Sequence, residues 1–424
     1  MNFSSPYIIT ILISSVVIIS FLFSRFSKRT NIPSAILLIL FGVGIKLGMD
    51  QLEIASSGNI LQVLELLGVV GLIMIVLEAA LDLKLTRDKS SLIVKSFLVA
   101  LVSLMLCSFS IGWIINYFII DSFFQSLFYA IPLSIMSSAI IIPSVGNLRP
   151  EKKEFLIYES TFSDILGIMF FYFLSGYADS TDAGAIVLGI TGNIVITIVV
   201  SIIISYAMVL LLQTLKEKVK LFFLIALLIL LYSAGKMLHM SSLLIILVFG
   251  LILNNYQLFF TGKLQKFIKG DALDHVLEDF HVVTLESAFV IRTFFFVIFG
   301  ITLDLASLND INTALIGVGI TLLMYLIRFV CLKSAGLKSI MPVLLIAPRG
   351  LITVLLFFSI PANYLFEGFN PGILLYTIIL TNIAMSAGLI FKPTEAADID
   401  KLNFPDINEL DEELEKIKAA KVQL

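Results

Sequence analysis

Residues 155–175 of the chain read FLIYESTFSDILGIMFFYFLS. This stretch is long enough to cross a hydrocarbon core of about 30 Å as one helix. It nevertheless contains two carboxylates, Glu159 and Asp164, with hydroxyl groups between them. An ionisable group inside a membrane is costly, and it is a candidate for function by default. The stretch therefore predicts a membrane-spanning helix that carries a functional site.

Similar apolar runs recur along all 424 residues. The chain is 59% hydrophobic and only 14% charged, with a mean hydropathy of +1.05. A soluble protein carries about 25% charged residues. The sequence therefore predicts an all-α polytopic membrane protein of about 13 transmembrane helices. The expected spans are residues 7–24, 33–49, 60–81, 91–116, 124–146, 155–175, 184–212, 221–238, 241–254, 285–304, 312–332, 340–361 and 372–391.

Loop charges orient these spans. Connections after odd-numbered spans are rich in Lys and Arg, whereas those after even-numbered spans carry mainly Asp and Glu. Basic loops stay in the cytoplasm, so the N-terminus is expected outside and the C-terminus inside. Residues 1–392 would form the membrane domain, with an amphipathic interfacial helix at about 258–283. Residues 393–424 would form a short acidic cytoplasmic tail.

Other expected spans also carry charge. Glu78 lies in the third span, Arg328 in the eleventh and Arg349 in the twelfth. Arg328 is the natural partner for Glu159, because a buried charge left alone is very costly. Glu78 is either an ion ligand or a group that orients one.

The remaining charged and sulfur-containing residues receive simpler predictions. Glu286 and Arg292 lie near the cytoplasmic end of the tenth span and are expected to reach toward the water interface. Cys107 and Cys331 are expected to be buried thiols. Residues at span ends are expected at the water interface or without a chemical role; these are Asp82, Asp304, His239, His275 and His281.

Helical spacing places the polar groups of residues 155–175 on neighbouring stripes. Glu159 stacks over Ser163, and Ser160 stacks over Asp164. Dehydrated Na⁺ or Li⁺ prefers such hard oxygen ligands. A single carboxylate can hold a proton or a cation, but not both at once. Asp164 is therefore predicted to bind the two in competition, which is the chemistry of antiport.

Two spans contain helix breakers at matching places. In the fifth span, Pro132 and Pro143 flank Ser137 and Ser138. The twelfth span contains the prolines and the Arg-Gly pair of IMPVLLIAPRG, namely Pro342, Pro348, Arg349 and Gly350. Interrupted helices are tolerated in membranes where the backbone lines a cavity. Their separation by seven spans predicts two inverted six-helix repeats around a central binding site.

In these motifs the chain resembles the cation:proton antiporter superfamily, the sodium/proton exchanger-like group. GLIMIVLEAALDL, which contains Glu78, is similar to the third-span pattern ending in Phe-Glu-Ala-Gly-Leu. ESTFSDILG is similar to the sixth-span Glu-Ser-Leu-Phe-Asn-Asp signature and puts Asp164 on the ion-binding aspartate and Ser160 on its serine. FFFVIFGITLDL is similar to the tenth-span Phe-Phe-Val-x-x-Gly-x-x-Leu-Asp stretch. Arg328 and APRGL match the eleventh-span arginine and twelfth-span Arg-Gly motif.

The resemblance implies a homodimer with a dimerisation bundle and a core bundle that moves like an elevator. The broken fifth and twelfth spans would cross beside Asp164. A Glu159–Arg328 ion pair would hold the core together, and Ser137 or Ser138 would be ion ligands. Two departures from the family pattern matter. Ser163 replaces the family's Asn or Asp, which suggests electroneutral exchange, and Ser137-Ser138-Ala139 is closer to the potassium-efflux and electrogenic branch.

The sequence thus predicts a Na⁺ (or Li⁺)/H⁺ antiporter of a cell membrane, of the bacterial inner-membrane type, surrounded by lipid. Asp164 would be its Na⁺ site, with Ser160, Glu78, Ser137, Ser138 and Ser163 as further candidate ligands. K⁺/H⁺ exchange or K⁺ efflux on the same fold is the alternative, and a sodium-coupled symporter of an organic solute is a more distant one. Enzyme motifs, nucleotide motifs and basic clusters suited to nucleic acid are missing from the sequence. No enzyme activity, cofactor or nucleic-acid partner is therefore expected.

Overall fold

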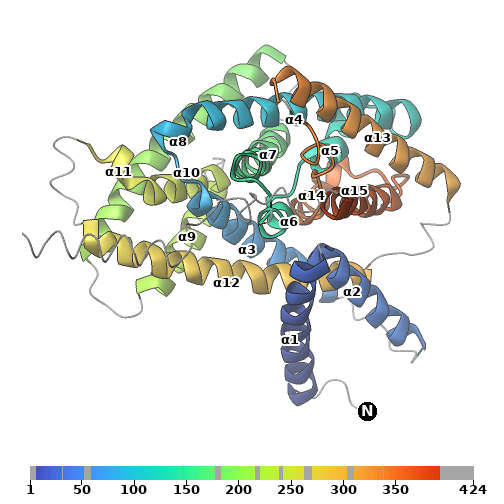
Figure 1. Cartoon of the computed structure of the whole chain (residues 1–424), viewed down its shortest axis with the longest axis horizontal. Coiled ribbons are helices and arrows are strands. Elements are labelled where there is room, and N and C mark those ends of the chain that lie inside the picture. Colours follow the sequence, from blue (N-terminus) through green and yellow to red (C-terminus); the bar gives the residue numbers. More distant parts are fainter. Residues whose placement is uncertain are drawn as a thin grey trace, which may run out of the picture.

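The structure is a computed structural model that describes residues 6–30, 32–51, 59–146, 148–176, 183–214, 220–237, 242–261, 270–302, 310–337 and 339–391. Over these residues the chain is helical and contains no strand (Figure 1). The helices are α1 (Pro6–Thr30), α2 (Ser34–Gln51), α3 (Asn59–Asp82), η1 (Arg87–Lys89), α4 (Ser90–Phe118), α5 (Phe123–Ser134), α6 (Ser138–Ser144), α7 (Pro150–Gly176), α8 (Ala183–Thr214), α9 (Lys220–Met237), α10 (Ser242–Asn254), α11 (Tyr256–Phe259), α12 (Gly270–Thr302), α13 (Ile311–Ser334), α14 (Leu351–Phe358), η4 (Ala362–Tyr364) and α15 (Gly372–Phe391).

Most helices follow the predicted apolar spans, but the fifth span is divided into α5 and α6, and the α-helix of the twelfth, α14, covers only Leu351–Phe358 of residues 340–361. Within the described ranges, 7 helices are long and apolar enough to cross a membrane, and further apolar helices are shorter. The all-α prediction is confirmed, whereas the count of about 13 spans, the inverted repeats and the orientation stay predictions. The tail 393–424, Asp304 and His239 lie outside the described residues.

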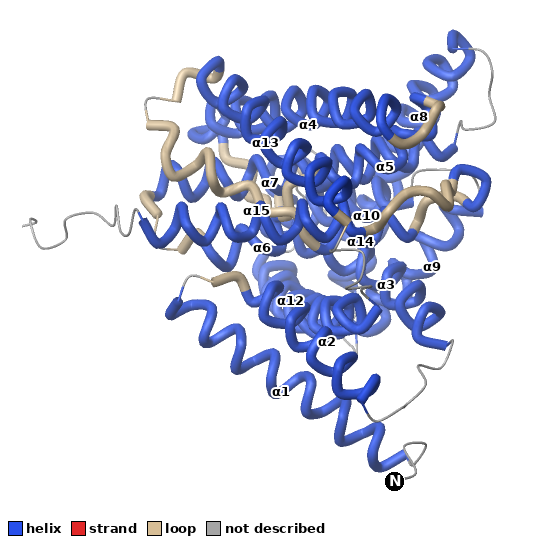
Figure 2. The backbone as a smooth tube through the Cα atoms, turned by 90° about the vertical axis from the view of Figure 1, so that its right-hand side faces the viewer, coloured by secondary structure: helices blue, strands red, loops and turns tan. Residues whose placement is uncertain are grey.

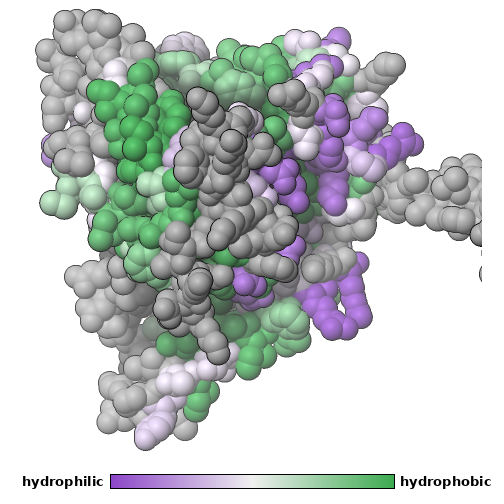
Figure 3. Space-filling view, turned by 90° about the vertical axis from the view of Figure 1, so that its left-hand side faces the viewer, coloured by the Kyte–Doolittle hydropathy of each residue, from purple (hydrophilic) through white to green (hydrophobic). Residues whose placement is uncertain are grey.

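Apolar side chains on the outer helices face away from the protein. Leu315, Leu322 and Leu326 of α13 are each more than 60% exposed. Aromatic side chains, including Trp113 and Tyr117, are exposed in the last turns of α4. Figure 3 shows the face that carries α11 and the start of α12, where apolar side chains gather on one side and hydrophilic ones on the other. A surface of this kind suits contact with lipid tails and with water at separate places.

The helices pack in two groups. The α12 group contains α1, α2, α3, α8, α9, α10 and α12; the α7 group contains α4, α5, α6, α7, α13, α14 and α15. Packing within each group is more extensive than packing between them. In Figure 2, α1, α2, α3 and α12 lie below α4, α7 and α13. Contacts of α3 with α7 and α14 are among those that join the two groups.

One helix differs from the sequence prediction. The sequence predicts an interfacial connecting helix at about 258–283, before the tenth span. In the structure, α12 runs without interruption from Gly270 to Thr302, so residues 270–283 continue directly into the tenth span, while residues 262–269 lie outside the described residues. The amphipathic residues 270–283 contain no proline to end the helix, and buried side chains such as Leu273, Val276 and Phe280 continue its packed face.

The chain that leaves α3 is fixed from both groups. The side chain of Asn255, next to α10, accepts a hydrogen bond from Leu85 N (2.6 Å) and donates one to Leu83 O (2.9 Å). The hydroxyl of Tyr158, on α7, donates to Lys84 O (2.8 Å). These bonds satisfy backbone groups of the non-helical residues that follow α3. Residues 83–86 therefore lie between the two groups.

Both predicted helix interruptions are present, and they contact each other. Residues 135–137 are non-helical between α5 and α6, and residues 339–350 are non-helical before α14. Ser137 N donates a hydrogen bond to Pro348 O (2.9 Å). A Cβ on Gly350 would lie 2.6 Å from Ile140 Cδ1 and 2.9 Å from Ser137 Oγ, so a larger residue there would have to displace these side chains. Pro143 instead lies inside α6 with an exposed side chain, beyond the interruption itself.

Candidate ion-binding site

Asp164 lies on α7, beside the interruption between α5 and α6. Its side chain is buried, and its Oδ2 accepts a hydrogen bond from Ser138 N (2.9 Å). Its Oδ1 and the hydroxyl of Ser137 are also buried, and they have no hydrogen-bond partner within the described part of the chain. Buried polar atoms are nearly always paired, so both oxygens are free to coordinate a cation, and the carboxylate oxygen of Asp164 can instead take a proton. Asp164 is positioned by α7, and Ser137 is positioned by the non-helical residues 135–137 that lie beside it.

The neighbouring serines of α7 already have backbone partners. Ser163 Oγ accepts a hydrogen bond from Met136 N (2.9 Å), and Ser160 Oγ donates one to Ile157 O (3.2 Å). Ser163 therefore holds the non-helical segment against α7. Gly167 contributes to the same contact, because a Cβ there would overlap the side chain of Ile135.

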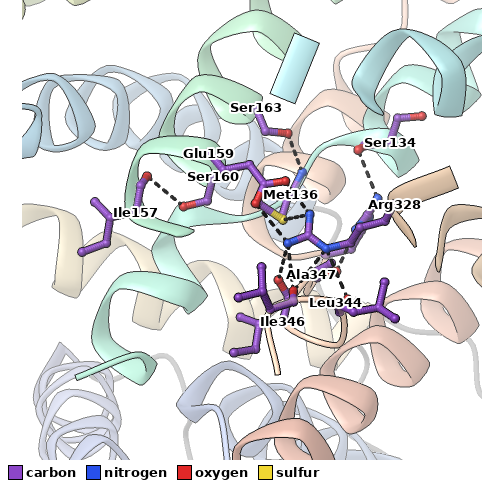
Figure 4. A network of polar contacts seen from close by, with 12 residues as sticks. Ser134, Met136, Ile157, Glu159, Ser160, Ser163, Arg328, Leu344, Ile346 and Ala347 are labelled. Atoms are coloured by element: carbon purple, nitrogen blue, oxygen red, sulfur yellow. Dashed lines mark hydrogen bonds and ion pairs between the residues drawn. The ribbon is translucent and has the colours of Figure 1, made fainter. Parts of the chain in front are cut away.

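Glu159 and Arg328 form a buried ion pair between α7 and α13 (Figure 4). Arg328 Nη1 donates to Glu159 Oε1 (2.6 Å), and Nη2 donates to Oε2 (3.0 Å). The guanidinium also donates to carbonyl oxygens of the second interruption and contacts the sulfur of Met136. Those carbonyls belong to Val343, Leu344 and Ile346. Arg328 thus joins α7, α13 and both interruptions.

Arg349 fixes the two interruptions to each other. Its guanidinium donates to Leu133 O (3.0 Å), Ser134 O (3.2 Å) and Ala347 O (2.7 Å). The first two carbonyls end α5, where a helix carries partial negative charge, so a cation is favourable there. A cavity of about 20 Å³ lies between this guanidinium and the Glu159–Arg328 pair, with room for about one water molecule.

Two residues that the sequence analysis did not single out hold the backbone of Arg349. Thr381 Oγ1 accepts a hydrogen bond from Arg349 N (3.1 Å), and Asn382 Nδ2 donates to Arg349 O (2.8 Å). Both residues lie on α15 and are fully buried. Their signal in the sequence is a Thr-Asn pair inside an apolar span.

Glu78 has an unexpected partner. Arg292 Nη1, on α12, donates to both Glu78 Oε1 (3.0 Å) and Oε2 (2.8 Å). The prediction that Arg292 reaches toward the water interface is therefore wrong, because the nearby buried carboxylate attracts it inward; Glu286 is exposed. One turn farther along α3, Asp82 Oδ1 lies 2.8 Å from His281 Nε2 on α12. The sequence assigns no role to His281, and the structure pairs it with Asp82.

Other groups in the described ranges show no sign of a resident metal. No cluster of three or more His, Cys, Asp or Glu side chains in those ranges is placed to hold a metal ion. Cys107 and Cys331 are buried free thiols, as predicted. The charged groups of the membrane region instead gather around the two interruptions and along the α3–α12 contact.

These features define a class: a multi-pass helical transporter with a buried carboxylate beside two contacting helix interruptions. The family model described as "Sodium/hydrogen exchanger, transmembrane" matches residues 11–395. The chain belongs to this family, so it is a multi-pass membrane cation/proton antiporter and not an enzyme.

Solved structures agree with this fold. A structure of the sodium proton antiporter MjNhaP1 from Methanocaldococcus jannaschii, at pH 8, superposes with a TM-score of 0.69 and 20% identity. The match covers 89% of this chain and 95% of that one. An electron-microscopy structure of the same protein gives a TM-score of 0.64 at 19% identity, covering 91% of this chain and 95% of that one. A search of curated protein sequences finds no match.

Proposed function

We propose that the protein exchanges Na⁺ or Li⁺ for H⁺, with Asp164 binding the cation and the proton in competition. The observation that carries the proposal is the buried Oδ1 of Asp164, which has no hydrogen-bond partner among the described residues, while Oδ2 is bound to Ser138 N beside the first interruption. An unpaired carboxylate oxygen in a buried site is a costly arrangement unless it binds a positive charge. A proton and a small dehydrated cation both meet that need, so either can leave only when the other replaces it.

The serines around Asp164 fit a small-cation site. The free hydroxyl of Ser137 and the lone pairs of Ser160 and Ser138 provide neutral oxygen ligands beside a single carboxylate. Hard cations prefer such oxygens. Ser163 is uncharged and accepts a hydrogen bond from Met136 N, so it adds no negative charge to the site. We therefore propose exchange of one cation for one proton, with no net movement of charge.

The two helix groups support an alternating-access mechanism. The α7 group contains Asp164, both interruptions and the Glu159–Arg328 pair, and it packs less extensively against the α12 group than within itself. We propose that the α7 group moves as a body against the α12 group, which exposes Asp164 to one side of the membrane and then to the other. In this proposal the α12 group provides the contacts of a homodimer, the N-terminus is outside, and inverted repeats relate the two interruptions.

The test is the collapse of a preset pH gradient in proteoliposomes when Na⁺, Li⁺ or K⁺ is added. Wild type is expected to dissipate the gradient with Na⁺ or Li⁺, and Asp164→Asn is expected to be inactive, because an amide cannot exchange a proton for a cation. Asp310→Asn, at the exposed start of α13, serves as the control for expression and reconstitution. A response to K⁺ alone would contradict the proposed ion, and full activity of Asp164→Asn would contradict the proposed site.

A second experiment tests whether the exchange moves net charge across the membrane. With the membrane potential clamped by K⁺ and valinomycin, the rate of an electroneutral exchange does not change with the imposed potential. A rate that rises or falls with the potential would contradict one-for-one exchange and would leave the role of Asp164 to the first experiment.

A further inference from the structure

Glu78 and Arg292 form a buried ion pair outside the Asp164 site. Their side chains are 10% and 18% exposed, and a single guanidinium nitrogen, Nη1, contacts both carboxylate oxygens. Within the part of the chain that the structure describes, Arg292 donates to no other acceptor. Its remaining guanidinium nitrogens are thus not anchored to the backbone. A contact made by one nitrogen can be exchanged for another cation more easily than a fully anchored one.

Glu78 is also placed to act on the proposed site. Its helix, α3, packs against α7, which carries Asp164, and against α14, which follows the second interruption. Glu78 and Asp164 are both buried, and they lie on helices that pack against each other. No hydrogen bond joins them among the described contacts, because Glu78 is turned to Arg292. The pair is therefore adjacent to the site but belongs to the other helix group.

The neighbouring charges differ from Arg292. Asp82 and His281 lie on the same two helices, α3 and α12, and pair with each other. Glu286, also on α12, is exposed. Arg292 is consequently the cation that neutralises Glu78 in this structure. A guanidinium neutralises the carboxylate directly, without a proton on the carboxylate.

We propose that Arg292 is a tethered cation that competes with the transported cation for Glu78, and that it thereby lowers the protein's apparent affinity for that cation. This inference rests on the proposed cation/proton exchange at Asp164. When the site is empty, Arg292 neutralises Glu78. When a cation enters beside Asp164, the Glu78 carboxylate turns from Arg292 toward it and adds a second negative charge. Each binding event then includes the release of Arg292, which weakens net binding.

The test compares the apparent KM for Na⁺ in wild type, Arg292→Gln and Arg292→Lys proteoliposomes. Removal of the tethered charge is expected to lower the KM on the order of tenfold, because Glu78 becomes available in every molecule. Arg292→Lys keeps the charge and is expected to stay near wild type. His281→Gln, which alters the neighbouring pair on the same helices, is the matched control and is expected to leave the KM unchanged.

A double variant shows whether Arg292 acts through Glu78. Glu78→Gln removes the contested carboxylate, so adding Arg292→Gln to it is expected to change the KM no further. A further fall in the double variant would show that Arg292 repels the cation directly and would overturn the proposal. This comparison still decides the question if Arg292→Gln alone cannot be purified.

The outcomes separate this inference from the proposed function. An unchanged or raised KM in Arg292→Gln, with wild type active, overturns the competition and leaves the exchange at Asp164 intact. A wild type that exchanges no cation for protons overturns the proposed function, and this inference with it.

Discussion

The two ion pairs inside the membrane region differ in how their arginines are held. Arg328 uses all three guanidinium nitrogens and contacts Glu159 together with carbonyl oxygens of the second interruption. Arg292 uses one nitrogen and contacts Glu78 alone within the described residues. The Glu159–Arg328 side chains are 1% and 5% exposed, whereas those of Glu78 and Arg292 are 10% and 18% exposed.

This difference indicates two uses of the same chemical pair. A guanidinium with several fixed acceptors keeps its position, because moving it would leave many buried groups unpaired at once. Such a pair can hold α7, α13 and both interruptions as one body. A guanidinium with one partner can leave it at the cost of one contact. The first pair is suited to a permanent joint within the moving group, and the second to a contact that changes during transport.

The largest effect should come from breaking the anchored pair. Arg328→Met leaves Glu159 buried without a partner and frees the carbonyls of the second interruption, so the free energy of unfolding should fall by about 3–5 kcal/mol. Unfolding in detergent by circular dichroism measures the loss. Arg292→Met is the matched comparison, and its loss should be clearly smaller because fewer contacts disappear. Equal losses would contradict the distinction between the two pairs.

A smaller effect should follow from Asn255→Ala. Because Arg292 holds Glu78 through one nitrogen only, we expect the Asn255 side chain to anchor α3 more strongly than this ion pair does. Asn255 bonds both Leu83 O and Leu85 N. Loss of these bonds should lower the free energy of unfolding by about 1–2 kcal/mol. Amide hydrogen exchange should rise at residues 83–86 and remain unchanged at α13. Unchanged protection at residues 83–86 would show that Tyr158 alone fixes the segment.

The smallest effect should occur at the start of α13, the helix that carries Arg328. The hydroxyl of Thr313 and the N–H of Asn312 bind Asp310 and hold the pKa of its carboxyl below the usual value. The charged cap therefore stabilises α13 above the pKa of the unfolded chain and is lost as pH falls through the lower pKa of the folded state. The melting temperature of wild type relative to Asp310→Asn should decrease between about pH 6 and pH 3. A constant difference would show that the charge of Asp310 does not contribute.

Much of the fold could be predicted because each span is specified locally. Apolar length predicted helices such as α13 and α15 to within a few residues. The prolines at 132 and 348 predicted interruptions in the correct spans. The sequence did not place the first break at residues 135–137, since Pro132 and Pro143 both lie inside helices. Hydropathy also could not show that α12 is continuous, because its first half is amphipathic.

The residues of the site could be predicted where a charged side chain lies well inside an apolar span. The ion pair of Glu159 with Arg328 follows from the cost of burying either charge alone. The same argument applies to Glu78 and Arg292, but the position of Arg292 near a span end suggested water as its partner. The choice between water and a carboxylate 214 positions away depends on how α3 packs against α12, which one sequence does not specify.

The contact between the two interruptions has a consequence for mutagenesis. Ser137 N and Pro348 O are both main-chain atoms, so replacing either side chain with another ordinary residue leaves their hydrogen bond in place. Substitutions other than proline therefore report the roles of the two side chains and do not test this hydrogen bond. Proline at position 137 is the encoded change that deletes the donor, because its nitrogen carries no hydrogen. An ester in place of the peptide bond at that position would remove the same donor without altering any side chain.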